Sequence, residues 1–97
     1  MSATVIRVTR VGDGSYVAPA CVYKLDTPRT MQRYGKRRRV TFVWVSTAKV
    51  FGRWETYAFA CDRRGKIRDW CELPGSTSWD GEPPADAFAQ VLASLTA

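Results

Sequence analysis

Histidine is absent from this chain of 97 residues. The side chain that most often serves as a general acid or base near neutral pH is therefore missing. The cysteines are few and odd in number, and no two are spaced C-x-x-C (Cys21, Cys61 and Cys71). Because the sequence offers no four-ligand zinc site, we expect neither a metal nor another cofactor. We expect all three thiols to be reduced and structural.

Recognisable catalytic motifs are missing too. The sequence contains no G-x-S-x-G motif and no glycine-rich phosphate loop. The nearest approach to a carboxylate cluster consists of Glu55, Asp69 and Glu72, but strand alternation predicts that Glu72 faces away from the other two. General acid–base catalysis needs groups that are positioned together. We therefore expect a protein that is not an enzyme and has no small-molecule substrate.

No apolar stretch in the chain is extended. The longest uncharged one is Val40–Val45, which is far too short to cross a bilayer. The N-terminal residues MSATVIRVTR carry spaced charges and do not resemble a signal peptide. We expect a protein that works in the cytoplasm and has no membrane partner.

Net charge, by contrast, is concentrated in one place. The formal charge at pH 7 is +6, and residues 29–39 hold six basic side chains and no acidic one. The other 86 residues carry nine basic and nine acidic side chains, which cancel. After Arg68 the chain has five acidic residues and no basic one, so its last third is an internal counterweight or a second binding surface. A concentrated positive segment attracts phosphates or an acidic protein face.

Composition and periodicity predict a single α+β domain over residues 1–97. A content of 45% hydrophobic and 25% charged residues is typical of globular proteins. Short alternating or β-branched segments predict five strands, over residues 4–11, 21–25, 40–45, 54–61 and 66–73. An apolar stripe predicts a helix over residues 84–96. We expect a mostly antiparallel sheet with this C-terminal helix packed on one face.

Three details of the sheet follow from local residues. Pro28 is expected to end the second strand, because proline cannot donate to a ladder. The strand at residues 40–45 is apolar on both faces, which is typical of a central strand. Residues 62–66 (DRRGK) have the pattern of a type I turn with a glycine bulge. Across that turn, one core face is expected to hold Tyr57, Phe59, Cys61, Ile67, Cys71 and Leu73.

Residues 40–76 resemble a pattern that recurs in small accessory proteins of tailed phages. There a V-x-V-S strand leads to an E-T-x-x-F strand, a D-x-x-G turn and a W-x-x-L segment, matched here by Val43–Ser46, Glu55–Phe59, Asp62–Gly65 and Trp70–Leu73. The resemblance implies a phage-encoded protein made in the cytoplasm of a bacterial host. The family has no assigned activity, so it transfers no functional residue, and the basic segment lies outside the matching part.

The basic segment is the leading candidate for a binding site. A solvated hairpin tip, or ion pairs with the acidic C-terminal third, would also account for short charge runs. The density here exceeds what solubility requires, and arginines suit phosphate contacts while Tyr34 suits stacking on a base. We expect a hairpin that binds its partner through Arg29, Arg33, Tyr34, Lys36, Arg37, Arg38 and Arg39.

The tryptophans are the second candidate. We expect Trp44, Trp54 and Trp70 to lie in the core under the helix, the alternative being an exposed platform beside the basic hairpin. Trp79 lies in a polar loop, STSWDGE. There it is either a plug over the sheet edge or an exposed anchor for a protein partner.

Two non-enzymatic functions remain. The charge pattern favours a protein that binds nucleic acid or a nucleoprotein through the basic hairpin, and this is our leading hypothesis. The phage resemblance favours an inhibitor of a host protein, docked through a sheet edge, the Trp79 loop or the basic tip against an acidic surface. The sequence leaves the oligomeric state open between monomer and homodimer.

Overall fold

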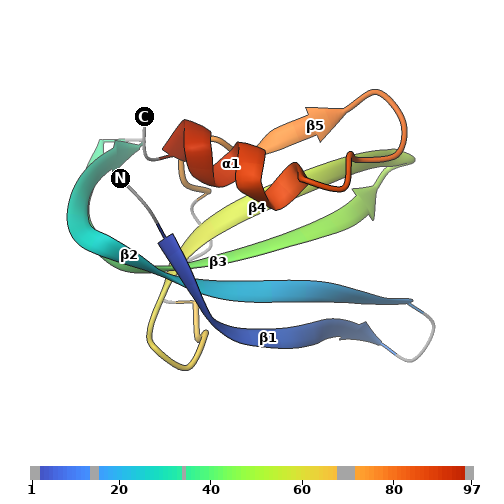
Figure 1. The fold of residues 1–97 in the computed structure, drawn as a ribbon. Helices are drawn as coiled ribbons and strands as arrows, with labels where there is room; N and C mark the ends of the chain where they lie inside the picture. Colours follow the sequence, from blue (N-terminus) through green and yellow to red (C-terminus); the bar gives the residue numbers. More distant parts are fainter. Residues whose placement is uncertain (1–2, 14–15, 34, 68–71, 96–97) are drawn as a thin grey trace.

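The chain folds as a bent antiparallel sheet with one helix over it (Figure 1). The computed structural model describes residues 3–13, 16–33, 35–67 and 72–95. In chain order the elements are β1 (Ala3–Asp13), β2 (Tyr16–Arg33), β3 (Lys36–Val50), β4 (Arg53–Cys61), β5 (Thr77–Trp79) and α1 (Ala87–Leu95). The five strands lie in chain order and each neighbouring pair is antiparallel. The predicted α+β architecture is confirmed.

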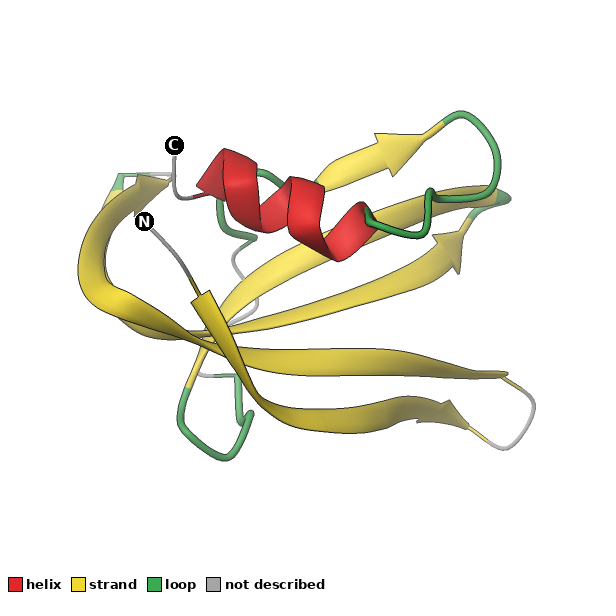
Figure 2. Ribbon diagram, viewed as in Figure 1, coloured by secondary structure: helices red, strands yellow, loops and turns green. Residues whose placement is uncertain are grey.

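The strands β2 and β3 are much longer than predicted. Pro28 does not end β2, which continues to Arg33. The register between β2 and β3 shifts between Lys24 and Arg29, where four residues of β2 face one residue of β3. Pro28 lies inside this irregularity, where strand pairing does not require a backbone N–H donor. The hairpin of β2 and β3 therefore continues past Pro28 with a bend, and its outer part curls up toward α1 (Figure 2).

The fifth strand is not where the sequence predicted it. The turn at residues 62–66 forms as expected, since Gly65 N–H donates to the Asp62 carbonyl over 3.0 Å and Gly65 has a φ of 89°. Among the described residues beyond this turn, Ile67 forms a bridge with Cys61, and the Leu73 N–H donates to the Ala58 carbonyl over 2.8 Å, but no fifth strand forms over residues 66–73. The neighbour of β4 at the sheet edge is β5 instead, with Trp54 opposite Trp79. The indole N–H of Trp79 donates to Oγ1 of Thr56 over 2.9 Å, a contact that periodicity cannot reveal.

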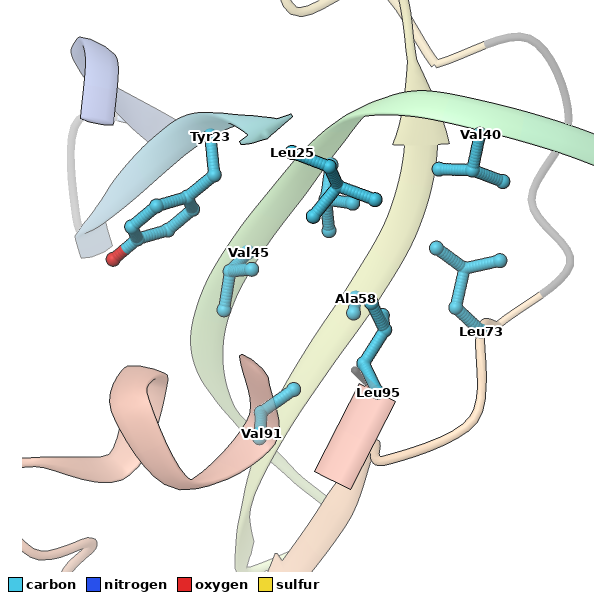
Figure 3. Packing of buried hydrophobic residues seen from close by; sticks show 9 residues of the cluster. Tyr23, Leu25, Val40, Val45, Ala58, Leu73, Val91 and Leu95 are labelled. Atoms are coloured by element: carbon cyan, nitrogen blue, oxygen red, sulfur yellow. The ribbon is translucent and has the colours of Figure 1, made fainter. Parts of the chain in front are cut away.

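One face of the sheet is covered by α1. The helix begins at Ala87, three residues later than predicted, because residues 84–87 form a separate turn in which the Ala87 N–H donates to the Pro84 carbonyl over 3.1 Å. Val91 and Leu95 are buried against strand residues such as Ala58, and Phe88 and Leu92 pack at the margin, so the predicted apolar stripe is confirmed (Figure 3). The whole cluster comprises Tyr23, Leu25, Val40, Val43, Val45, Ala58, Leu73, Val91 and Leu95.

A second cluster lies on the opposite face, formed by Ala20, Val22, Trp44, Phe59 and Cys61. Trp44 is therefore a core residue, as expected, but it does not lie under the helix. Tyr57 and Ile67 pack against the same cluster, which confirms part of the predicted face. Leu73 belongs to the helix-covered cluster, so its predicted face was wrong. The Leu73 N–H donates to the Ala58 carbonyl over 2.8 Å, so Leu73 lies beside Ala58 and not in the register on which that prediction rested. Cys71 and Trp70 lie outside the described residues.

The turn after β4 closes over this second cluster. A Cβ added at Gly65 would lie 2.9 Å from Cγ2 of Val22 and 3.9 Å from Cδ1 of Trp44. Glycine is required there both for its positive φ and for this close approach. The central strand β3 is thus covered on both faces, as predicted. Of the described cysteines, Cys21 and Cys61 are free thiols. No helix of the described residues has the length and apolar character to cross a membrane.

The connection between β3 and β4 carries an exposed aromatic side chain. Val50 pairs with Arg53 and leaves Phe51 and Gly52 as the two turn residues, with φ values of 49° and 79°. Two positive φ values are those of a type I′ turn, which favours Asn-Gly. A bulky residue in this region costs about 1–2 kcal/mol. The Phe51 side chain is fully exposed, at 101%, so no packing within the chain offsets that cost.

Candidate functional site

The basic segment forms the outer part of the β2–β3 hairpin. It is built mainly of paired strands rather than a loop, with Arg29 opposite Val40 and Gln32 opposite Arg37. Gly35, with a φ of 75°, lies in the connection between the strands. The predicted hairpin between the second and third strands is thus present. Arg33 and Lys36 are described by their backbone alone, and Tyr34 lies outside the described residues.

Strand alternation divides the arginines between two faces. Arg38 lies opposite Met31, and both are half-buried, as is Arg29. Arg37 and Arg39 are exposed. In a strand, successive side chains point to opposite faces. The outer face of the hairpin therefore presents Arg37 and Arg39 to solvent.

A groove opens where β3 and β4 diverge. Their pairing begins at Phe42 opposite Cys61, so the earlier residues of β3 have β2 on one edge and this groove on the other. The groove measures ≈ 540 Å³. Its lining comes from the start of β3, the end of β4 and the following turn, and comprises Arg37, Arg38, Arg39, Val40, Thr41, Phe42, Ala60, Cys61, Asp62 and Arg63. We call it the basic groove.

Arg63 is the residue that sequence reasoning missed. It adds a fourth arginine to the lining from a turn more than twenty positions away in the chain. The signal was present, because the DRRGK turn was predicted correctly and follows directly on β4. What periodicity could not supply was the register of β3 on β4, which brings that turn beside the start of β3.

The acidic residue of the groove, Asp62, is hydrogen-bonded within its own turn. Oδ1 of Asp62 accepts the backbone N–H of Arg64 over 2.8 Å and that of Lys66 over 2.9 Å. These bonds hold the carboxylate against its own turn and fix the position of the adjacent Arg63. Four arginines and one aspartate line the groove, so its surroundings carry a net positive charge and a positive potential.

The thiol in the groove is not an activated nucleophile. Cys61 is buried, and burial together with the nearby Asp62 raises its pKa from 9.0 to about 12. Since the thiolate is the reactive form, this thiol is inert at neutral pH. Among the described residues, no group of three or more histidine, cysteine or acidic side chains is placed to hold a metal.

Two carboxylates meet elsewhere, against the sequence prediction. Glu55 and Glu72 both line a small pocket of ≈ 140 Å³ with Tyr57, whose hydroxyl donates to Glu55 Oε2. They were predicted on opposite faces, which is wrong because the Leu73 N–H donates to the Ala58 carbonyl over 2.8 Å, so this segment lies beside β4 in a register other than the predicted one. Burial, and after it Glu55 and Glu72, raise the pKa of the Tyr57 phenol. Asp69 lies outside the described residues.

Trp79 does not join the basic residues. It is half-buried opposite Trp54 at the start of β4, whereas the basic groove lies at the end of β4. Its indole bond to Thr56 places it over the outer edge of β4, the geometry of the predicted plug. Trp54 is also half-buried.

The chain matches no family model, no curated protein and no solved structure.

Proposed function

We propose that this protein binds nucleic acid, alone or in a nucleoprotein, through the basic groove, and that it acts without catalysis. The observation that supports this is the meeting of Arg37, Arg38 and Arg39 with Arg63 in one groove. Guanidinium groups form bidentate hydrogen bonds with phosphate oxygens, so a groove lined by several arginines suits a phosphodiester backbone. Together with the phage resemblance, this makes a nucleic acid of a bacterial host the proposed ligand.

The affinity is expected to depend little on base sequence. The lining described here consists mainly of arginines, small side chains and Phe42. Phosphate contacts fix position and orientation but carry no sequence information. Binding should therefore be salt-dependent, similar for unrelated sequences, and measurable by fluorescence anisotropy of a labelled 20-nucleotide strand or duplex.

The decisive variant is R37Q/R39Q, which removes the two exposed arginines of β3. We expect at least tenfold weaker binding at low salt, and a slope of log affinity against log salt that is shallower by up to about two units. The fold should be near wild type, because exposed charges contribute little to stability. The matched control is K24Q/K66Q, which removes the same charge from exposed positions outside the groove. Equal losses in both variants would show a net-charge effect and would refute the groove.

Arg63 and Arg64 provide a second matched pair. They are adjacent and exposed, but only Arg63 lines the groove. R63Q should weaken binding several-fold and R64Q much less, while both should retain the wild-type fold. Equal losses of affinity in R63Q and R64Q would show that the 62–66 turn is not part of the binding site.

One observation favours inhibition of a host protein as a second candidate. The edge strand β1 exposes Val5, Ile6 and Val8, at 47%, 42% and 67%. An open edge with apolar side chains suits the addition of a strand from another protein. This function predicts a stoichiometric host protein that stays bound after nuclease treatment and is lost in V8K. Retention of that protein by V8K would exclude the β1 edge.

A further inference from the structure

The end of the molecule away from the basic hairpin carries a second groove, which the proposed function does not use. It lies between the β3–β4 turn and the connection from β5 to α1 (Figure 1). It measures ≈ 440 Å³, and its lining includes the facing pair Trp54 and Trp79. We call it the tip groove.

Opposite charges form the two walls of the tip groove. Lys49 and Arg53 come from the β3–β4 hairpin, and Asp80 and Glu82 follow β5. Arg53 and Asp80 make an exposed ion pair of 3.4 Å across the groove. Nζ of Lys49 lies 5.8 Å from the Trp54 ring centroid. A surface with equal numbers of both charges is a poor match for a phosphate backbone and a good match for another surface of mixed charge.

Phe51 lies in the turn beside the tip groove, and its exposed aromatic ring suits a groove of this kind. Its side chain is fully exposed and its backbone has a φ of 49°. Exposed large aromatics are typical anchors of protein interfaces, and an unfavourable backbone conformation often marks a functional position. The turn itself would be better served by asparagine, so the turn does not account for Phe51.

We propose that two copies of this chain associate through their tips, each inserting Phe51 into the tip groove of the other. A two-fold axis makes such a contact self-complementary, because the same patch supplies anchor and groove. It also sets the basic wall of one copy against the acidic wall of the other. Lys49 and Glu82 are the exposed wall charges outside the Arg53–Asp80 pair. Because one anchor and a small groove bury less area than a standard interface, the dimer forms at roughly 10–500 µM.

Sedimentation equilibrium of the full chain tests the anchor. Wild type should shift from monomer to dimer across this concentration range, and F51N should raise the dimer dissociation constant at least tenfold. F51N folds, because asparagine suits the type I′ turn. V8N, which changes an exposed apolar residue on β1, is the control and should dimerise as wild type does. A wild-type chain that is monomeric up to about 1 mM, or a dimer unchanged by F51N, would overturn the proposal.

Charge reversal tests the arrangement of the two copies. K49E alone and E82K alone should each weaken the dimer at least threefold, since each sets like charges against one another. K49E/E82K exchanges the charges of both walls and should restore the dimer to within twofold of wild type. Failure of the double variant to recover would rule out the facing walls. Nucleic-acid binding by F51N should remain intact, which separates this proposal from the basic groove.

Discussion

At the scale of single residues, two glycines differ in whether a side chain would fit at their position. Gly75 has a φ of 101°, and a Cβ added there would lie 2.8 Å from the carbonyl oxygen of Val91. Gly81 has a φ of 127°, but a Cβ there would meet nothing within 4 Å. The two glycines therefore share the backbone requirement and differ in the contact with α1.

The comparison of G75A with G81A isolates that contact. Both substitutions force alanine into a positive φ, which costs about 1–2 kcal/mol. G75A must also move α1 or its own loop, so we expect a further loss of about 1–3 kcal/mol of unfolding free energy. Urea denaturation measures both variants. Equal destabilisation would mean that the loop yields without disturbing the helix.

At the scale of elements, the helix stabilises the fold by covering one face of the sheet. Leu95 is 5% exposed and lies in the cluster with Ala58. We expect L95A to lower the unfolding free energy by about 2–4 kcal/mol, since it leaves a cavity under the helix. S94A, at an exposed neighbouring position, should change it by less than about 0.5 kcal/mol. A stable L95A protein with native circular dichroism would show that the helix contributes little to the core.

Elements with a strong local pattern could be predicted, and those that depend on distant contacts could not. The strand from Trp54 to Cys61 and the turn after it follow from alternation and from Gly65. By contrast, β5 is three residues long and mostly polar, and its position rests on the contact between Trp79 and Thr56. The extension of β2 past Pro28 rests likewise on a bulge against β3. The basic groove could be predicted only in part from the sequence, because the arginines of β3 were predicted together but Arg63 was not.

At the scale of the whole molecule, protonated groups are buried on both faces of the sheet. Burial, and after it Cys21, raise the pKa of Tyr23 from 10.0 to about 12, and burial with Asp62 raises that of Cys61 from 9.0 to about 12. Tyr23 belongs to the helix-covered cluster and Cys61 to the opposite one. The folded state holds these protons more tightly than the unfolded chain does.

Stability should therefore fall in alkali. The contribution of Cys61 is fully present below pH 9 and is lost as the pH rises toward 12, because the unfolded chain releases its proton first. Between pH 8 and 10.5, we expect the unfolding free energy of C61A to fall by about 1–2 kcal/mol less than that of wild type. V22A, a neighbouring core change without a titrating group, should keep the wild-type slope. An identical slope in C61A would remove Cys61 as a source of the alkaline loss.

The strand order has a consequence for how the chain is made. Because β1 to β5 lie side by side in the order of synthesis, each strand finds its partner in the segment that left the ribosome just before it. Every hairpin can close without waiting for residues still untranslated, and short loops make such closure fast. The helix α1 follows all five strands in the chain, so it is synthesised after them and covers its face of the sheet later. Until then, the apolar surface around Ala58 stays open to the solvent and to whatever binds nascent chains.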